Sequence, residues 1–262
     1  MPARPRIPAR VCPNTPIRDT RGAFRARLFL DSSPSAGTSG RRQFLQTVCS
    51  SAVVGFAAQA GIELVAPLKL SAQTNLSPDA ALQELLAGNQ RFAANRLTSI
   101  EHDLTILKEH TVSKQEPFAA VLACADSRVP VELVFDQTIG HIFVTRVAGN
   151  FVTPEIIASL EYGVAVLGVK ALLVLGHSNC GAVKAAMKAD TVPGQISALY
   201  PHIRQAVEQS GGNFDKAIEA NAKIQAELLR TSSTVIREAV KAGKLKVEAG
   251  VYDLASGKVA LS

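Results

Sequence analysis

The sequence of 262 residues lacks several features that would place it in a simple class of protein. Its four cysteines are too few to hold a chain of this length together by disulfide bonds. Charged residues make up only 19% and hydrophobic residues 47%, so the chain can bury a core and is not disordered as a whole. After Ala72 there is no internal repeat, no low-complexity tract and no apolar run long enough for a stable membrane span.

The net charge is distributed unevenly. A formal charge of +6 and an isoelectric point of about 9.3 would, for the whole chain, suggest a nucleic-acid or membrane-surface partner. Residues 1–72, however, contain ten Lys and Arg against three acidic residues, a net charge of +7. Residues 73–262 carry a net charge of −1. The basic character therefore belongs to the first quarter of the chain, and we expect no nucleic-acid partner for the remainder.

The first quarter resembles an export leader. Arg41-Arg42-Gln43-Phe44-Leu45 resembles a twin-arginine export signal, and an apolar stretch follows from about Val48 to Ala60. This stretch is too short and too weakly apolar to span a bilayer stably, which favours the core of a signal peptide. Leu70-Ser71-Ala72 provides small residues of the A-x-A kind, so we predict cleavage after Ala72. An ordinary basic pair before an apolar helix, as in Sec-type export or a membrane anchor, is the alternative.

Residues 1–40 are rich in Arg, Pro and Ser and poor in acidic residues, so we do not expect them to fold. They fit an over-long start, an extended n-region, or an organellar transit peptide ahead of a lumenal signal. The predicted organisation is a leader over residues 1–72, with the signal at 41–72, and one domain over 73–262. We expect the mature protein in the periplasm or another extracytoplasmic compartment, with the thylakoid lumen or another organelle as the alternative.

Helix and strand patterns alternate along residues 73–262. Ser77-Pro78-Asp79 predicts the start of an amphipathic helix of about four turns, because it combines an N-cap, a first-turn proline and an acid at the helix dipole. Apolar runs predict strands, and helical periodicity predicts helices between them. The strands are expected at Phe118–Cys124, Ile142–Arg146, Ala171–Gly176, Leu245–Tyr252 and Val259–Leu261, and the later helices after Thr153-Pro154, from about Cys180 to Lys188, near Gln195–Gln209 and over Asp215–Ala242. This alternation predicts a single α/β domain with a mostly parallel sheet flanked by helices.

Residues with metal-binding chemistry follow two of these strands directly. Residues 124–128 read Cys-Ala-Asp-Ser-Arg, and residues 177–181 read His-Ser-Asn-Cys-Gly. The carboxyl ends of parallel strands form the usual binding edge of an open sheet, so the two motifs can converge although 53 residues separate Cys124 from His177. Two thiolates and one imidazole, here Cys124, His177 and Cys180, form a ligand set of catalytic zinc that leaves a fourth position for water.

Simpler explanations exist for each of these residues. A cysteine at a strand end is usually a small buried hydrophobe, and two cysteines in an exported chain can form a disulfide bond. A disulfide needs neither His177 nor the spacing of Asp126 and Arg128, and a reactive zinc site uses both. The other histidines have no ligand-type spacing and are interpreted as surface or satisfied polar residues; they are His102, His110, His141 and His202.

The two motifs together, in this order and spacing, resemble the β-class carbonic anhydrases, whose pattern is C-[SA]-D-S-R followed some fifty residues later by H-x-x-C-G. The resemblance extends from about Leu82 to the C-terminus. It implies a β-carbonic anhydrase-like fold and a zinc lyase that hydrates CO₂ reversibly to bicarbonate and a proton by attack of zinc-bound hydroxide. It also implies one Zn²⁺ per subunit on Cys124, His177 and Cys180, and a homodimer or higher homo-oligomer.

The resemblance also implies roles for neighbouring residues. The arginine of the first motif, Arg128, holds the carboxylate of Asp126 off the metal, and in a closed form Asp126 is itself the fourth ligand. Family members have a glutamine whose amide lies near the substrate oxygen, across a dimer interface, and the matching residue here is Gln115. Three positions that line a narrow apolar pocket in the family correspond to Phe143, Ala148 and Tyr162. A regulatory bicarbonate site of some members uses a tryptophan, for which this sequence has Val121, although Arg146 matches another part of that site.

Two other functions fit the same residues. An enzyme of the same fold acting on CS₂ or COS would use the same metal site and differ in access to its pocket. An exported zinc or redox-binding protein without catalytic activity would not need Asp126 and Arg128, so the intact pair argues against it.

Overall fold

The computed structural model describes residues 74–99 and 111–262. The predicted leader with its Arg41-Arg42 pair, the cleavage site after Ala72, and His102 and His110 lie outside these residues. Within the described part of the chain, no helix has both the length and the apolar character needed to cross a membrane.

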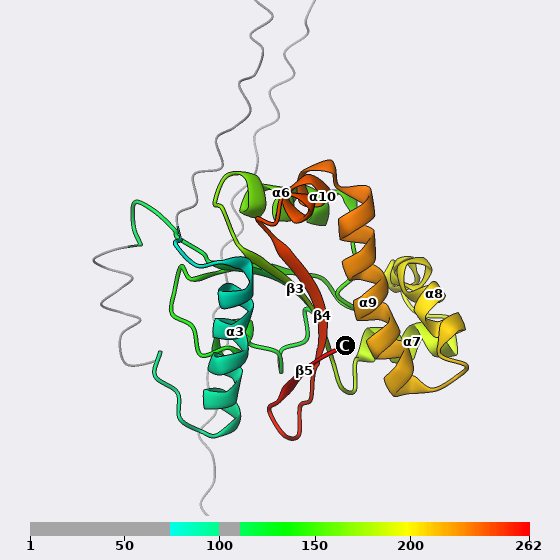
Figure 1. Cartoon of the computed structure of the whole chain (residues 1–262). Coiled ribbons are helices and arrows are strands. Elements are labelled where there is room, and N and C mark those ends of the chain that lie inside the picture. Colours follow the sequence, from blue (N-terminus) through cyan, green and yellow to red (C-terminus); the bar gives the residue numbers. More distant parts are fainter. Residues whose placement is uncertain (1–73, 100–110) are drawn as a thin grey trace, which may run out of the picture. The chain divides into compact units, whose positions relative to one another are not determined.

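Strands and helices alternate through the domain (Figure 1). The strands are β1 (Ala119–Ala123), β2 (Ile142–Arg146), β3 (Ala171–His177), β4 (Lys246–Tyr252) and β5 (Val259–Leu261). The helices are α3 (Pro78–Ala93), α5 (Val131–Val134), α6 (Pro154–Ala165), α7 (Gly181–Lys188), the 3₁₀ helix η1 (Ile196–Leu199), α8 (Tyr200–Gln209), α9 (Phe214–Ser232) and α10 (Thr234–Lys241).

The strands form one sheet in the order β2-β1-β3-β4-β5. β1 pairs in parallel with both β2 and β3, β3 pairs in parallel with β4, and only β5 runs antiparallel, to β4. The mostly parallel sheet predicted from the sequence is therefore confirmed. Because the chain leaves β1 and β3 at the same edge, the residues that follow these two neighbouring strands are brought together.

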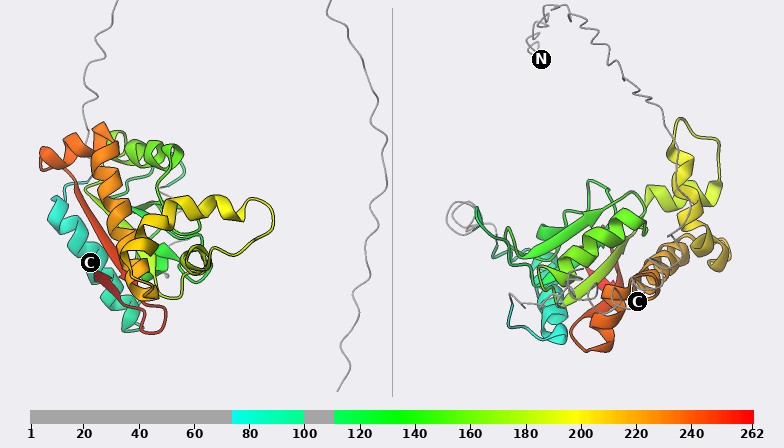
Figure 2. Two further views of the ribbon diagram at one scale, coloured as in Figure 1. Left: turned by 90° about the vertical axis from the view of Figure 1, so that its right-hand side faces the viewer. Right: turned by 90° about the horizontal axis from the view of Figure 1, so that it is seen from above.

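Helices cover both faces of the sheet (Figure 1). One face packs alternate strand residues such as Val121 and Leu173 against Leu85 of α3. The other face packs the intervening residues, such as Leu122 and Val174, against α6, α9 and α10. This alternation follows from the two-residue period of a strand, and the burial of β1 and β3 on both faces explains their continuous apolar sequence. In both views of Figure 2, α7 and α8 (yellow) extend away from α3 (cyan).

Polar side chains set the starts of the helices. The hydroxyls of Ser77 and Thr153 accept hydrogen bonds from the backbone N–H groups of the first turns of α3 and α6, and a proline follows each as predicted. The helical segment predicted over Asp215–Ala242 is divided into α9 and α10. Ser233 has an extended backbone and its hydroxyl caps α10, which explains the break. The short helix α5 was not predicted, since four residues are too few to show a periodicity.

Candidate metal centre

Cys124, His177 and Cys180 lie together at the carboxyl edge of the sheet. Cys124 directly follows β1, His177 is the last residue of the neighbouring β3, and Cys180 is the N-cap of α7. All three are buried, and their ligand atoms lie within 4.8 Å of one another. Both thiols are free, with 4.0 Å between the two Sγ atoms. A disulfide bond requires about 2.05 Å, so the site consists of two separate sulfur donors and one imidazole.

The turn between His177 and Cys180 is fixed by the strand beside it. The backbone N–H of Ser178 donates to the carbonyl oxygen of Tyr252, and the Ser178 hydroxyl accepts from the N–H of Leu254 at 2.9 Å. Asn179 has a φ of +55°, a left-handed conformation that asparagine adopts more readily than most residues. This turn lets His177 and Cys180 face the same point from a strand and from a helix N-cap.

His177 has one ring nitrogen without a partner. Nδ1 lies 2.9 Å from the carbonyl oxygen of Ser178, and since a carbonyl oxygen only accepts, Nδ1 carries the hydrogen. In a neutral imidazole Nε2 then carries the lone pair, and this fully buried atom has no hydrogen-bond partner among the residues that the structure describes. Leaving a buried polar atom unpaired is costly, and the lone pair of a neutral imidazole is a common metal ligand. The environment of His177 thus fits a metal ligand better than a packed core residue.

The two thiols are coupled by a hydrogen bond between their sulfur atoms. A hydrogen bond from Cys180, stronger than the opposing effect of burial, lowers the pKa of Cys124 to about 4, and the N–H of Gly149 at 3.3 Å from Sγ adds to this. The hydrogen bond with the Cys124 thiolate, together with burial, raises the pKa of Cys180 far above its usual range. Binding of a divalent cation would release the remaining thiol proton and give two thiolates. Two thiolates and one neutral imidazole are a donor set suited to Zn²⁺.

Asp126 and Arg128 form a two-point ion pair beside this cluster. Nε and Nη2 of Arg128 donate to the two carboxylate oxygens of Asp126 at 2.9 and 2.8 Å, and the Arg128 backbone N–H donates to Oδ1. The guanidinium hydrogen bonds hold the pKa of Asp126 well below its usual range. Oδ2 of Asp126 lies 3.9 Å from Nε2 of His177, so the ionised carboxylate borders the space between the ligand atoms. Arg146 supports the same loop by donating to the carbonyl oxygens of Cys124 and Asp126.

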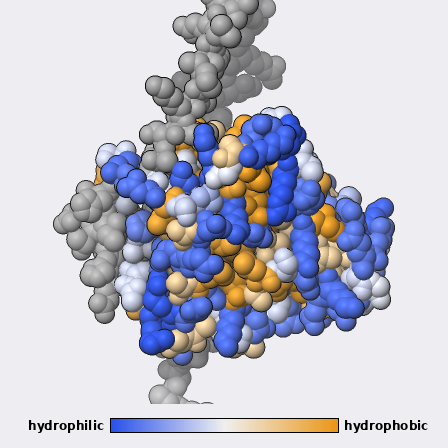
Figure 3. All heavy atoms as spheres, viewed as in Figure 1, coloured by the Kyte–Doolittle hydropathy of each residue, from blue (hydrophilic) through white to orange (hydrophobic). Residues whose placement is uncertain are grey.

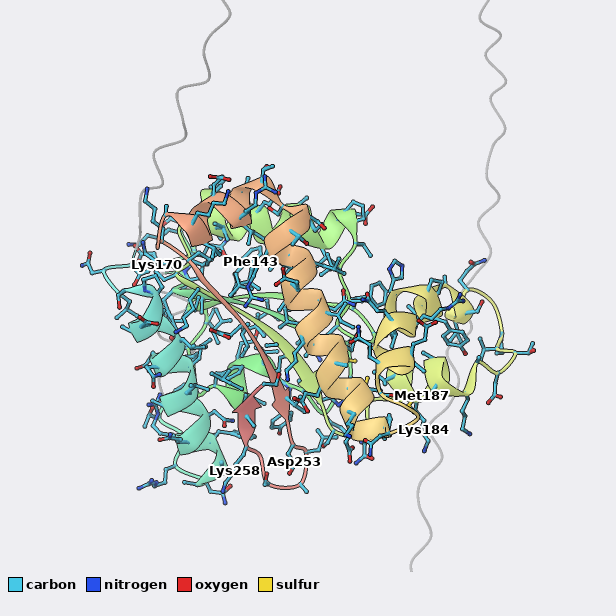
Figure 4. The ribbon with its side chains drawn as sticks, turned by 45° about the vertical axis from the view of Figure 1, so that its right-hand side comes forward. Phe143, Lys170, Lys184, Met187, Asp253 and Lys258 are labelled. Carbon is cyan, nitrogen blue, oxygen red and sulfur yellow. The ribbon has the colours of Figure 1, made fainter. Side chains whose placement is uncertain are left out.

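The residues predicted to line the pocket lie in two different places. Gln115 and Tyr162 line a cavity of about 560 Å³ at the edge of the sheet where β1 begins, opposite the edge that carries Cys124. The ring of Phe143 lies 6.2 Å from that of Tyr162, and in Figure 4 Phe143 is drawn well away from Lys184 and Met187 of α7. Ala148 precedes Gly149 and so lies beside the cluster. Within one chain, the structure therefore does not bring Gln115, Phe143 or Tyr162 to the three ligand atoms.

Gly149 is a part of the site that the sequence did not indicate. Its φ of +90° favours glycine, and a Cβ at this position would lie 2.7 Å from Cδ1 of Ile203. Gly149 and Asn150 both have positive φ, so the pair forms the turn after β2. A Gly-Asn pair is a turn signal, but it does not reveal that the N–H of Gly149 points at the sulfur of Cys124.

Comparisons with known proteins agree on one family. A family model described as carbonic anhydrase matches residues 119–259. Carbonic anhydrase 2 of Mycobacterium tuberculosis is 33% identical over 199 residues, covering 71% of this chain and 94% of that protein. A carbonic anhydrase of Pseudomonas aeruginosa is 37% identical over 164 residues, covering 56% of this chain and 74% of its own. Among solved structures, the β-carbonic anhydrase CafA of Aspergillus fumigatus is 27% identical, with a TM-score of 0.56 over 69% of this chain and 90% of that chain.

Proposed function

The chain belongs to the β-class carbonic anhydrase family, and from this we propose which of its residues carry out the reversible hydration of CO₂ to bicarbonate and a proton. Cys124, His177 and Cys180 hold one zinc ion. Asp126 orients the nucleophile, and Arg128 orients Asp126. The observation that carries this proposal is the buried, unpartnered Nε2 of His177 beside two free thiols, all within 4.8 Å.

The residues of the chain divide the chemistry between them. When bound, zinc supplies a hydroxide nucleophile at neutral pH by lowering the pKa of water. The carboxylate of Asp126 accepts a hydrogen bond from this nucleophile, because Arg128 keeps it ionised and turned toward the ligand atoms. Both oxygens of Asp126 accept hydrogen bonds from Arg128, and this would keep the carboxylate from becoming a metal ligand itself, as it would be in a closed form.

The first test removes the imidazole. His177→Gln keeps a side chain of similar size but lacks the basic nitrogen, so we expect loss of bound zinc together with loss of CO₂ hydration measured by stopped flow. His141→Gln is the matched control, because His141 is exposed and belongs to the loop before β2. It should retain zinc and activity.

Two results would contradict the assignment. One is a His177→Gln protein that hydrates CO₂ at the wild-type rate, and the other is wild-type protein that is active with less than one zinc per ten chains. Because His177 is buried, urea unfolding of the metal-free proteins must accompany the assay. Similar unfolding midpoints show that the loss of zinc is not a loss of fold.

We further propose that the chain forms a homodimer or a higher homo-oligomer, and that Gln115, Phe143, Ala148 and Tyr162 line the substrate pocket of the assembly. Exposed apolar side chains surround the cavity that contains Gln115 and Tyr162, since Val112 is 84% exposed and Val166 43%. Hydrophobic residues also gather over the sheet between α3 and α9 (Figure 3). Burial of such patches favours association. Sedimentation of Val112→Glu, with Lys188→Glu at the end of α7 as an exposed control away from this cavity, should show a smaller species for the first variant alone.

The leader proposal concerns residues 1–72. We propose that it directs export by a twin-arginine route, with cleavage after Ala72 and a mature domain over residues 73–262. Support comes from the Arg41-Arg42 pair, the apolar stretch behind it and the confinement of the positive charge to this segment. Replacing both arginines by lysine keeps the charge, so it should block export only if the pair itself is read. Export of that variant at the wild-type level would exclude the twin-arginine route and favour Sec-type export.

A further inference from the structure

Two buried amide side chains on α9 are not used by the mechanism above. Asn221 and Gln225 are four residues apart, so they lie on the same face of the helix, and each is about 1% exposed. Helix interiors facing a core normally carry apolar residues, and a buried amide is costly unless its donors and acceptors are paired. Their contacts should therefore show why polar groups lie here.

Both amides bind the loop between β2 and α6. Oε1 of Gln225 accepts a hydrogen bond from the N–H of Val152 at 2.8 Å, and Nε2 of Gln225 donates to Oδ1 of Asn221 at 3.2 Å and to the carbonyl oxygen of His202 at 3.1 Å. Nδ2 of Asn221 donates to the carbonyl oxygen of Gly149 at 2.8 Å. The helix thus holds the loop at two backbone groups three residues apart.

The same loop contacts a metal-binding sulfur. The N–H of Gly149 donates to Sγ of Cys124 at 3.3 Å. Gly149 has no Cβ and a left-handed backbone, so its two peptide groups would rotate easily if nothing held them. The hydrogen bond from Asn221 fixes the peptide on one side of Gly149, and the sulfur receives the N–H from the peptide on the other side.

We propose that Asn221 and Gln225 are positioning residues for the metal centre: through the backbone of Gly149 they aim one N–H group at the sulfur of Cys124. The inference rests on the proposed role of Cys124 as a metal ligand. An N–H···S hydrogen bond withdraws electron density from a thiolate and restricts its direction. Partners of metal ligands that act in this way typically account for roughly 10- to 100-fold in metal affinity.

The test compares the same substitution at two buried asparagines. Asn221→Leu removes the amide at similar volume without adding a charge. Asn89→Leu is the control, because Asn89 is also buried and its amide also binds backbone groups, those of Val134, Gly257 and Val259, none of which belongs to the loop that carries Gly149. Both variants should lose stability. Only Asn221→Leu should bind zinc more weakly, by roughly 10- to 100-fold in competition with a chelator.

The absorption spectrum of the cobalt-substituted proteins gives a second measurement, which a loss of stability alone does not change. Loss of the N–H···S hydrogen bond raises the energy of the sulfur electrons, so the sulfur-to-Co²⁺ charge-transfer band should shift to longer wavelength in Asn221→Leu and stay in place in Asn89→Leu. Gln225→Met, which keeps the length of the side chain, should shift the band in the same direction. An unchanged band and unchanged zinc affinity in folded Asn221→Leu would overturn the proposal.

A measurement on the wild-type protein keeps the proposal testable if the variants fail to fold. With ¹¹³Cd in place of zinc, the amide proton of Gly149 should show scalar coupling to the metal through the hydrogen bond to the Cys124 sulfur. Absence of this coupling, when the cysteine β-protons of the ligands do couple, would overturn the positioning role and leave the proposed function standing. Wild-type protein that binds none of the three metals would overturn both.

Discussion

Removing the guanidinium of Arg128 tests the geometry of the site most directly. Arg128→Ala deletes the two side-chain hydrogen bonds, at 2.9 and 2.8 Å, that hold the carboxylate of Asp126. Oδ2 of Asp126 is already only 3.9 Å from Nε2 of His177. Without these hydrogen bonds the carboxylate would be free to reach a metal held by Cys124, His177 and Cys180, and to compete there with the nucleophile.

The size of the effect follows from the exposure of the two partners. The side chain of Arg128 is 53% exposed, so water screens the pair and each charged hydrogen bond contributes less than in a buried site. The side chain of Asp126 is 17% exposed and the contact is two-pointed, which places the pair above the average surface ion pair. We therefore expect a several-fold shift toward the carboxylate-bound form in Arg128→Ala and a similar loss of activity near pH 7, more than an average surface ion pair would give.

The activity deficit of Arg128→Ala should depend on pH in one direction. Hydroxide competes with the carboxylate for the metal, so the deficit of Arg128→Ala in kcat/KM for CO₂ hydration should be largest near neutral pH and should shrink as the pH rises. Arg128→Lys keeps one charge but not the two-point contact, and it should lie between Ala and wild type. Stopped-flow assays over this pH range, with zinc content measured on the same samples, provide the data. Equal activity of Arg128→Ala and wild type at every pH would refute the reasoning.

Three further changes have expected outcomes. Cys124→Ser should lose zinc and hydration activity together in paired metal and stopped-flow assays, and retention of either at the wild-type level would contradict the ligand role. Asp136 is fully buried, and although burial opposes it, hydrogen bonds from Arg91 and the backbone hold its pKa well below the usual range. Asp136→Asn should therefore cost about 2 kcal/mol at neutral pH by urea unfolding, and this difference should shrink as the pH falls below about 4, because the carboxylate of the unfolded chain then takes up a proton while that of the folded protein stays ionised. A difference that persists in acid would exclude the ionised pair as its cause. Gly149→Ala introduces a Cβ 2.7 Å from Cδ1 of Ile203 at a φ of +90°, and it should lower stability by about 1–3 kcal/mol in thermal unfolding; an unchanged melting temperature would show that the loop adapts freely.

Much of the fold could be predicted from local sequence patterns. The Ser-Pro and Thr-Pro pairs at residues 77–78 and 153–154, the apolar run of β3 and the short final strand are signals carried by a few neighbouring residues, and the structure has each of them. The break at Ser233 could not be predicted, because a serine inside a helical pattern is tolerated and only packing decides whether it caps a new helix.

Some features of the candidate site could likewise be predicted from the sequence, and others could not. The two motifs and the parallel sheet were enough to expect Cys124 and His177 at one edge. The contacts of Asn221 carry no such signal, because an asparagine on a helix is usually a solvent-exposed residue and its partner, the carbonyl oxygen of Gly149, is 72 residues away. Contacts between a side chain and a distant backbone group depend on tertiary packing, which no local pattern encodes.

The closeness of Cys124 and Cys180 also matters for the unfolded chain. The two sulfurs are 56 residues apart in sequence and 4.0 Å apart in space, so a metal bound by both closes a long loop, as a covalent cross-link would. For a loop of this length the chain-entropy model of cross-links gives about 4 kcal/mol of stabilisation at 25 °C. The ion that serves the reaction would then also cross-link the ends of β1 and β3. A chelator would lower the free energy of unfolding as well as remove the activity.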